Sequence, residues 1–195
     1  IIWEQLKETI HTAVHFLDNV IDMNSYPKKE IEKNTKYTRK FGLGMMGFAD
    51  FLCQLKIKYD SEEGLDLANR LISFIKDAAY EKSQQLAQKR GVCPAWEGSE
   101  HQKNGRRMRN MSCLSIAPTG TISILAHASS GCEPLYAISY QRSLLGDKEL
   151  FYLNPTFEKI AQENGFYTPE LIKKIARAGS VQDLKEVPKE VREVF

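Results

Sequence analysis

The sequence has no long apolar run and contains only four cysteines in 195 residues. A membrane-spanning helix needs about 18 or more apolar residues, and the apolar opening of the chain is broken at once by Glu4 and Gln5. We therefore expect neither a membrane partner nor a signal peptide. The cysteines form no Cys-x-x-Cys pair and are too sparse for a disulfide scaffold; they are Cys53, Cys93, Cys113 and Cys132. This usage favours a reducing, cytoplasmic location.

Charge of one sign is also lacking, since 27 Lys and Arg stand against 25 Asp and Glu, for a net charge of +2. This balance argues against a protein that binds nucleic acid through bulk charge. At 42% hydrophobic residues the chain can bury a sizeable core, which excludes a disordered or low-complexity protein. The length suits one domain or a large piece of one. Because the sequence opens without Met and enters a helix almost immediately, we expect residues 1–195 to be a single segment of a longer polypeptide.

Apolar residues at steps of three and four predict helices over most of the first ninety residues. The predicted helices are 3–23, a short exposed helix or turn at 28–39, a buried helix at 41–57, and a long helix from about 61 to its stop at Gly91. The later segments are a loop at 91–110, strands at 111–117 and 135–140, an apolar run at 122–126, and short helices at 156–164 and 169–178. The pattern indicates a helix-rich α/β fold.

Gly42, Gly44 and Gly47 spell G-x-G-x-x-G, the fingerprint of dinucleotide-binding folds. That fingerprint must follow a buried hydrophobic strand, whereas residues 36–40 read Lys-Tyr-Thr-Arg-Lys and are too basic to form one. We expect instead that these glycines let a helix pack closely on a neighbouring element.

His11 and His15 stand four residues apart on the first predicted helix, at the spacing of a metal-ligand pair. Only Asp18 or Asp22 could supply a third ligand nearby, so we expect the histidines to flank the apolar stripe without a metal. The two acids are interpreted as a solvated helix edge with no catalytic role.

Arg106, Arg107 and Arg109 place three guanidinium groups just before the predicted strand at 111–117. Such a cluster can meet an anion or an acidic partner, but arginines in a glycine-containing loop are more often solvated or paired with carboxylates. The sequence leaves both readings open.

The most informative motif is Pro118-Thr119-Gly120-Thr121, which joins an apolar segment to an apolar run. Free backbone N–H groups gather at a helix N-terminus, where anions bind. Gly120 would let an anion approach the main chain, while Thr119 or Thr121 could cap the helix or donate to anion oxygens. No Gly-Lys-Ser/Thr follows, so this is not a Walker A loop. The motif predicts a phosphate-binding turn formed by Pro118, Thr119, Gly120, Thr121 and Ile122; an ordinary capped strand-to-helix turn is the alternative.

Segments 117–123 (Ala-Pro-Thr-Gly-Thr-Ile-Ser) and 129–134 (Ser-Ser-Gly-Cys-Glu-Pro) resemble the large catalytic subunit of ribonucleotide reductases. The resemblance is greatest to the adenosylcobalamin-dependent class II enzymes. Segments 13–22, 42–50 and 154–158 agree as well, in order, so the resemblance spans essentially the whole chain.

The resemblance implies the helix-rich C-terminal portion of a ten-stranded α/β barrel. In this family a cysteine on a central finger loop becomes a thiyl radical, with a carboxylate and an asparagine on the same loop and a cysteine pair as reductant. The corresponding Asn-Pro-Cys-Gly-Glu-like motif is absent here, and none of the four cysteines matches a catalytic one. We therefore expect no catalytic residue in this segment and no activity from it alone.

What the resemblance carries over is the substrate-phosphate turn, at residues 118–122. It also implies deoxyribonucleotide synthesis from a ribonucleotide substrate, adenosylcobalamin in the intact enzyme but none bound to this segment, and a dithiol reductant such as thioredoxin; it leaves room for a homodimer. Cys132 departs from the aliphatic residue common in relatives and is interpreted as packing, while Glu133 receives no role. A class I large subunit, or a helical binding or assembly protein without nucleotide chemistry, are the alternatives, and the choice between diphosphate and triphosphate substrates stays open.

Overall fold

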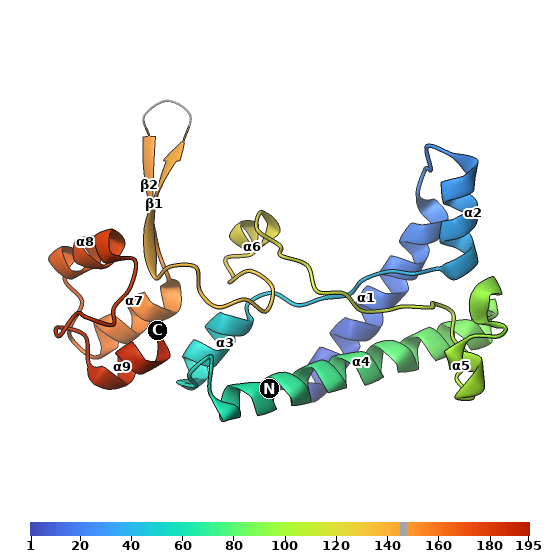
Figure 1. Cartoon of the computed structure of the whole chain (residues 1–195), viewed down its shortest axis with the longest axis horizontal. Coiled ribbons are helices and arrows are strands. Elements are labelled where there is room, and N and C mark those ends of the chain that lie inside the picture. The colour runs from blue at the N-terminus through green and yellow to red at the C-terminus, as the bar shows by residue number, and fades with distance from the viewer. Residues whose placement is uncertain (145–147) are drawn as a thin grey trace. The chain divides into compact units, whose positions relative to one another are not determined.

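The computed structural model describes the backbone of all residues except 145–147 and the side chains of all residues except 141–151. Its elements are α1 (Trp3–Met23), α2 (Lys29–Thr38), α3 (Phe48–Leu55), α4 (Glu62–Arg90), the 3-10 helix η1 (Pro94–Trp96), α5 (Glu100–Lys103), α6 (Ile122–Leu125), β1 (Ser139–Leu144), β2 (Lys148–Leu153), α7 (Pro155–Glu163), α8 (Pro169–Ala178) and α9 (Lys189–Val194) (Figure 1). The expectation of a helix-rich chain is confirmed. Among the described residues, no helix combines the length and the apolar character that crossing a membrane requires.

The chain divides into two compact units, Ile1–Gly44 with Ala68–Ala117 and Met45–Leu67 with Pro118–Phe195. In the first unit, α1 and α4 lie side by side and run in the same direction. The ring of Trp3, at the start of α1, packs on Phe74 with centroids 4.7 Å apart. Toward the other end of α1, a carboxylate oxygen of Asp18 lies 3.0 Å from the guanidinium of Arg90 at the end of α4. The predicted helices at 3–23, 28–39 and 61–90 are confirmed within two residues. The stop at Gly91 has the positive φ of +85° that favours glycine after a helix.

The predicted helix at 41–57 is wrong at residues 41–47 and 56–57, because only Phe48–Leu55 is helical. The preceding segment is extended and pairs with the segment that was predicted as a strand at 111–117. Leu43 donates to the carbonyl of Cys113 at 2.8 Å and accepts from the amide of Ser115 at 3.1 Å. This pairing amounts to one parallel bridge between Leu43 and Leu114, so the strand prediction is also wrong: the partner is too short to sustain a ladder. The predicted loop at 91–110 contains η1 and α5, the latter capped by the Ser99 hydroxyl.

In the second unit, β1 and β2 form an antiparallel hairpin in which Ser139 faces Leu153 and Leu144 faces Lys148. The predicted strand at 135–140 overlaps β1 only at its last two residues, and β2 was not predicted. The hairpin begins at Ser139 because its partner strand ends at Leu153, after which the chain turns into α7.

Helices α7 and α8 confirm the two short helices predicted near the C-terminus. The Asn154 side chain caps α7 and the Thr168 hydroxyl caps α8, which explains where each helix starts. The core that they share with the C-terminal segment contains Phe157, Ala161, Leu171, Ile175, Val181, Val187 and Val191. This core anchors the base of the hairpin through the buried Ile138.

Candidate functional site

The turn at residues 118–122 is held by Thr119. Its backbone has a φ of +58°, an uncommon value for a residue with a side chain. Its carbonyl accepts from the amide of Ser123 at 2.9 Å, which starts α6, and its Oγ1 accepts from the amide of Gly131 at 2.8 Å. Thr119 therefore joins the turn to the segment at residues 129–134.

Ser123 makes a second link between the same two segments. Its side chain is buried, and its Oγ lies 3.1 Å from the Oγ of Ser130. Thr121 stands at the N-cap position of α6 but makes no side-chain capping hydrogen bond, and it is exposed. Neither threonine caps α6, so the capped-turn alternative does not describe this turn. Among the described residues the Thr121 hydroxyl has no hydrogen-bond partner.

Gly120 occupies an open position. A Cβ built on it would meet no atom of the described residues within 4 Å, and its φ is not in the region that favours glycine. Contacts within the chain therefore do not account for a glycine here. The backbone amides of Gly120, Thr121 and Ile122 also make no backbone hydrogen bond within the described part of the chain. Amides and a hydroxyl arranged in this way can bind an anion.

The segment at 129–131 is positioned by Asp50 on α3. The Oδ2 of Asp50 accepts from the amide of Ser129 at 2.5 Å, and its Oδ1 accepts from the Nδ2 of Asn154 at 2.9 Å. The Oδ1 of Asn154 in turn accepts from the amides of Thr156 and Phe157 at 3.0 Å, so the α7 cap and the loop share one polar network. Gly47 adds a hydrogen bond to the carbonyl of Ser129 at 2.8 Å.

Sequence reasoning gave Asp50 and Asn154 no role. The pattern Asn154-Pro155 before a helix could have identified the cap, because Asn is favoured at the N-cap position and Pro at the next one. No local signal could have identified the contact between Asp50 and Ser129, which are 79 positions apart.

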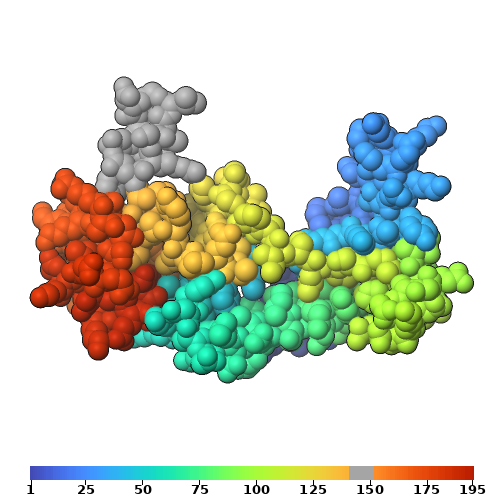
Figure 2. Space-filling view, viewed as in Figure 1, coloured from blue at the N-terminus to red at the C-terminus, as the bar shows by residue number. Residues whose placement is uncertain are grey.

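The turn and the loop open on a groove of about 780 Å³. The residues that line it are Gly120, Ser123, Ile124, His127, Ala128, Ser129, Ser130, Glu133, Pro134, Leu135, Tyr136, Ala137, Tyr140 and Tyr152. In Figure 2 the yellow surface around α6 and the orange surface of the segment that follows it flank this hollow. The groove has small polar residues on one part of its lining and three tyrosines on another. Its volume is within the range of small-ligand sites.

The three tyrosines form a cluster. Tyr140 stacks on Tyr152 with ring centroids 4.7 Å apart, and Tyr136 meets Tyr140 edge to face at 6.2 Å. Burial, together with the negative charge of Asp50, raises the pKa of Tyr152 above its ordinary value. The Tyr152 phenol therefore keeps its proton at neutral pH.

The glycines of the G-x-G-x-x-G motif do serve close packing, but against an extended segment rather than through a helix. A Cβ on Gly44 would lie 2.8 Å from the carbonyl oxygen of Ser115, and a Cβ on Gly42 would collide with the Ser115 side chain. Gly47 has a φ of +79° and precedes α3. The part of the prediction that named a helix at Gly42 and Gly44 is wrong, because the bridge between Leu43 and Leu114 keeps this segment extended.

The interpretation of Asp18 as part of a solvated edge is also wrong. Asp18 is fully buried and accepts from the Nε and Nη2 of Arg39 at 3.0 and 2.8 Å, and from the Nδ2 of Asn110 at 2.9 Å. Burial alone would raise its pKa, but these hydrogen bonds hold the pKa below its usual value. Asp22 is half-exposed and pairs with the same guanidinium at 2.7 Å. The group is an ion-pair network that ties α1 to the segment after α2.

The two histidines contact different residues of α4. His11 lies 3.9 Å from a carboxylate oxygen of Glu81, and burial lowers its pKa. The Nε2 of His15 lies 3.0 Å from a guanidinium nitrogen of Arg90. In the described part of the chain, no three His, Cys, Asp or Glu side chains come together in a way that could hold a metal ion.

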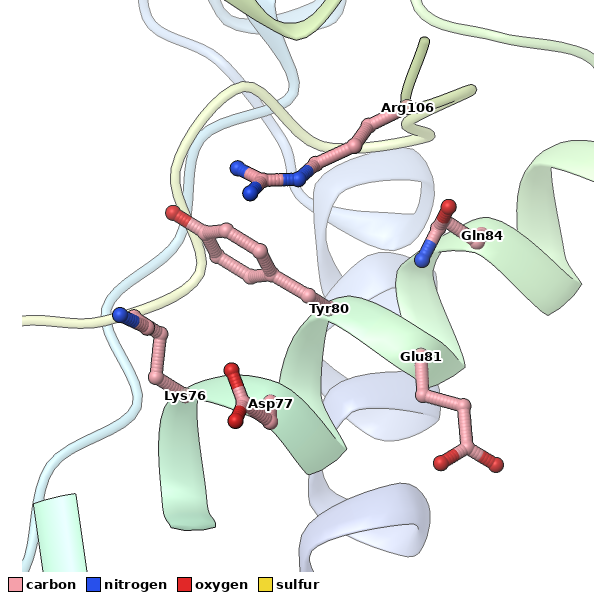
Figure 3. A pocket seen from close by; sticks show the side chains of 6 residues that line it. All are labelled: Lys76, Asp77, Tyr80, Glu81, Gln84 and Arg106. Carbon is pink, nitrogen blue, oxygen red and sulfur yellow. The ribbon is translucent and has the colours of Figure 1, made fainter. Parts of the chain in front are cut away.

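The three arginines before residue 111 do not converge on one point. Arg106 lies over the ring of Tyr80 and Arg107 over that of Trp96, each 5.9 Å from the centroid, while Arg109 donates to the carbonyls of Arg90 and Gly91. Figure 3 shows Arg106 extended over Tyr80 in a pocket of about 270 Å³. Lys76, Asp77 and Glu81 also line this pocket, so its charges are mixed. Among the described residues only Arg109 of the three lies near a carboxylate, with its Nε 3.6 Å from the Oδ1 of Asp18.

The cysteines are free thiols. Burial raises the pKa of Cys53 and of Cys113 to about 12, so neither forms a reactive thiolate near neutral pH. Cys132 is half-buried, and its carbonyl accepts from the Tyr59 hydroxyl at 2.7 Å.

Comparison with known proteins gives consistent results along the chain. The family model described as "Ribonucleotide reductase, barrel domain" matches residues 1–108 and 102–195. A vitamin B12-dependent ribonucleoside-diphosphate reductase of Thermoplasma acidophilum is 47% identical over 193 residues, which are 99% of this chain and 25% of the relative. A protein of the same description from Mycobacterium tuberculosis (strain CDC 1551 / Oshkosh) is 45% identical over 99% of this chain and 28% of the relative.

A solved structure, the class Id ribonucleotide reductase alpha subunit of Actinobacillus ureae, superposes with a TM-score of 0.79 at 28% identity. The match covers 96% of this chain and 34% of that subunit. The chain therefore spans about a quarter of the length of the curated relatives that it matches, and about a third of the solved subunit.

Proposed function

The chain belongs to the ribonucleotide reductase family, as part of its barrel domain, and from this premise we propose that it is a segment of a vitamin B12-dependent ribonucleoside-diphosphate reductase. Within that enzyme, the turn at residues 118–122 binds the phosphates of the ribonucleotide substrate. The intact enzyme would reduce a ribonucleoside diphosphate to the deoxyribonucleotide by thiyl-radical chemistry. The residues of that chemistry lie outside this segment.

The observation that carries the proposal is the open position of Gly120 in the groove. Among the described residues the amides of Gly120, Thr121 and Ile122 make no backbone hydrogen bond, and together with the hydroxyl of the exposed Thr121 they offer donors to an anion; the missing Cβ of Gly120 leaves room for it. The hydrogen bonds of Thr119 and Ser123 to the next segment fix these donors before a ligand arrives. Such preorganisation favours binding because the turn loses little conformational entropy when the ligand binds.

Dependence on vitamin B12 is proposed from the relatives. Three relatives that carry this description are 45–47% identical to the chain, whereas proteins described as subunit alpha of the diphosphate reductase are 28–32% identical. The solved class Id subunit supports a class I large subunit as the second candidate, at 28% identity. A dithiol reductant such as thioredoxin belongs to the proposal for the whole enzyme.

The groove by itself does not fit a cobalamin. The groove has a volume of about 780 Å³, which suits a drug-sized ligand, and cobalamin is considerably larger. No step of the reaction is therefore assigned to this cofactor through residues of this chain. What the chain's own residues do is bind the phosphates and, through them, orient the ribose.

Binding of ADP and pyrophosphate, measured by calorimetry or ³¹P NMR, tests the phosphate turn. Gly120→Val should weaken the binding of both ligands by at least about tenfold, because the valine side chain would occupy the position of the anion. Its melting temperature should be unchanged, since no atom of the described residues lies within 4 Å of the added Cβ. Ala126→Val is the matched control, because it adds bulk at an exposed position that does not line the groove. Equal affinities in wild type and Gly120→Val would refute the proposal.

A further inference from the structure

Tyr136 lines the same groove as Gly120, and within these 195 residues 93% of its surface is accessible. A tyrosine ring is a large apolar surface that is normally covered at least in part. Its contact with Tyr140 is edge to face, at an interplanar angle of 84°, so this contact does not cover both faces of the Tyr136 ring. A flat face of Tyr136 is thus available for stacking.

The neighbours of Tyr136 are fixed. Tyr140 stacks on Tyr152 at an interplanar angle of 28°, and the two residues face each other across the hairpin. The Ser139 hydroxyl donates to the carbonyl of Tyr152 at 3.0 Å, and Ser139 is buried. These contacts hold Tyr140 and Tyr152 in place as a platform beside Tyr136, which lowers the conformational entropy that ordering them on binding would cost.

One groove of about 780 Å³ contains both this platform and the small residues Gly120, Ser123, Ser129 and Ser130. A ligand that satisfies both parts carries an anionic group and a planar aromatic ring, which is the composition of a nucleotide. We propose that Tyr136, supported by Tyr140 and Tyr152, stacks on the nucleobase of the nucleotide whose phosphates bind the turn at 118–122. This inference rests on the proposed function and assigns a base subsite to it.

Stacking recognises the face of a base rather than its hydrogen-bonding edge, and every base has such a face. The subsite therefore accepts purines and pyrimidines alike. The same chemistry could be supplied by a free adenosyl group, so the experiment must separate a substrate base from that source.

Saturation-transfer NMR with ADP and CDP, with affinities from titration, tests the subsite on the 195-residue chain. Tyr136→Ala should raise the Kd of both nucleotides about tenfold and leave the Kd of pyrophosphate unchanged. Tyr136→Phe should bind like wild type because it keeps the ring. Tyr37→Ala is the matched control, since Tyr37 is an exposed tyrosine on α2 that does not line the groove.

Three results would overturn the base subsite. If ADP binds and pyrophosphate competes with it while Tyr136→Ala leaves the ADP affinity unchanged, the stacking role is wrong and the phosphate turn stands. If Tyr136→Ala weakens the binding of 5′-deoxyadenosine but of neither nucleotide, the Tyr136 ring stacks on an adenosyl group rather than on the substrate base. If neither ADP nor pyrophosphate binds the wild-type chain at millimolar concentration, the phosphate turn and the base subsite fail together.

Discussion

The Oγ1 of Thr119 accepts a hydrogen bond from the backbone amide of Gly131 at 2.8 Å. This bond joins the two motifs that line the groove, and it accompanies the positive φ of Thr119. An uncommon backbone conformation persists only where surrounding interactions hold it in place. The shape of the turn at 118–122 therefore depends on a contact made twelve positions further along the chain.

Replacing Thr119 with Val keeps the branched shape of the side chain and removes the acceptor. The amide of the buried Gly131 is then left unpaired, which should lower the free energy of unfolding by about 1–3 kcal/mol. The affinity for pyrophosphate should fall as well, because the turn loses its support. Urea unfolding and an anion titration on the same variant measure both effects. Thr119→Ser retains the hydroxyl and should stay close to wild type; a Thr119→Val protein with wild-type stability would show that the bond does not hold the turn.

Asp50→Ala tests the polar network behind the loop at 129–131. The substitution leaves the Ser129 amide and the Nδ2 of the buried Asn154 without their acceptor. We expect a loss of about 2–4 kcal/mol in the free energy of unfolding, from two unsatisfied donors. The control is Asp66→Ala, which removes an exposed carboxylate in the same unit and should change stability by less than about 0.5 kcal/mol. Similar unfolding midpoints for the two variants would contradict the role of Asp50.

How far the sequence could predict this fold depends on the range of the interactions involved. Helices α1 and α4 follow from apolar residues three and four apart, and α8 follows from the pattern between Thr168 and Gly179, because these signals are local. The extended segment before α3 was missed because its conformation comes from Leu43 pairing with residues 113–115, about 70 positions away. Its apolar residues fit a buried helix equally well when no partner is known.

The candidate site divides in the same way. The turn at 118–122 could be identified from a glycine and two threonines next to a proline, since these residues act on their own backbone. The three tyrosines could not, because Tyr140 and Tyr152 meet only through the register of a hairpin whose second strand was not predicted. Asp18 was misread because a carboxylate on a helix is usually solvated, and its partners Arg39, Arg90, Arg109 and Asn110 come from distant parts of the sequence.

Stability should depend on the charge of Asp18 in acid. Its pKa is lowered in the folded chain by hydrogen bonds from Arg39 and Asn110, which outweigh its burial. A lowered folded-state pKa means that the carboxylate stabilises the fold above its unfolded pKa of about 3.9, and that this contribution is lost as the pH falls through the folded-state value. Wild type should therefore lose stability below about pH 4.

The variant Asp18→Asn should be less stable than wild type at pH 7 by about 3–5 kcal/mol, because the buried Arg39 loses a partner. The difference in the free energy of unfolding between the two proteins should decrease as the pH is lowered from about 4 to about 2, because wild type loses the same charge there. Asp22→Asn is the matched control: it faces the same guanidinium with a half-exposed carboxylate, so its effect should be smaller. Denaturant unfolding at several pH values measures this, and a constant gap between pH 7 and pH 2 would be inconsistent with the buried ion pair.

Thr121→Ala separates a ligand role for this hydroxyl from a structural one. The side chain is exposed and makes no capping hydrogen bond, so its removal should leave the melting temperature within about one degree of wild type. If the hydroxyl donates to a phosphate oxygen, losing that charge-assisted hydrogen bond should cost about 1.5–3 kcal/mol, a ten- to hundredfold rise in the Kd of ADP. The control is Thr12→Ala, which removes an exposed threonine of α1 whose hydroxyl donates to a carbonyl of the same helix. It should change neither the melting temperature nor the Kd of ADP. An ADP affinity that survives Thr121→Ala would exclude this hydroxyl as a phosphate ligand and leave the turn's backbone amides as the donors.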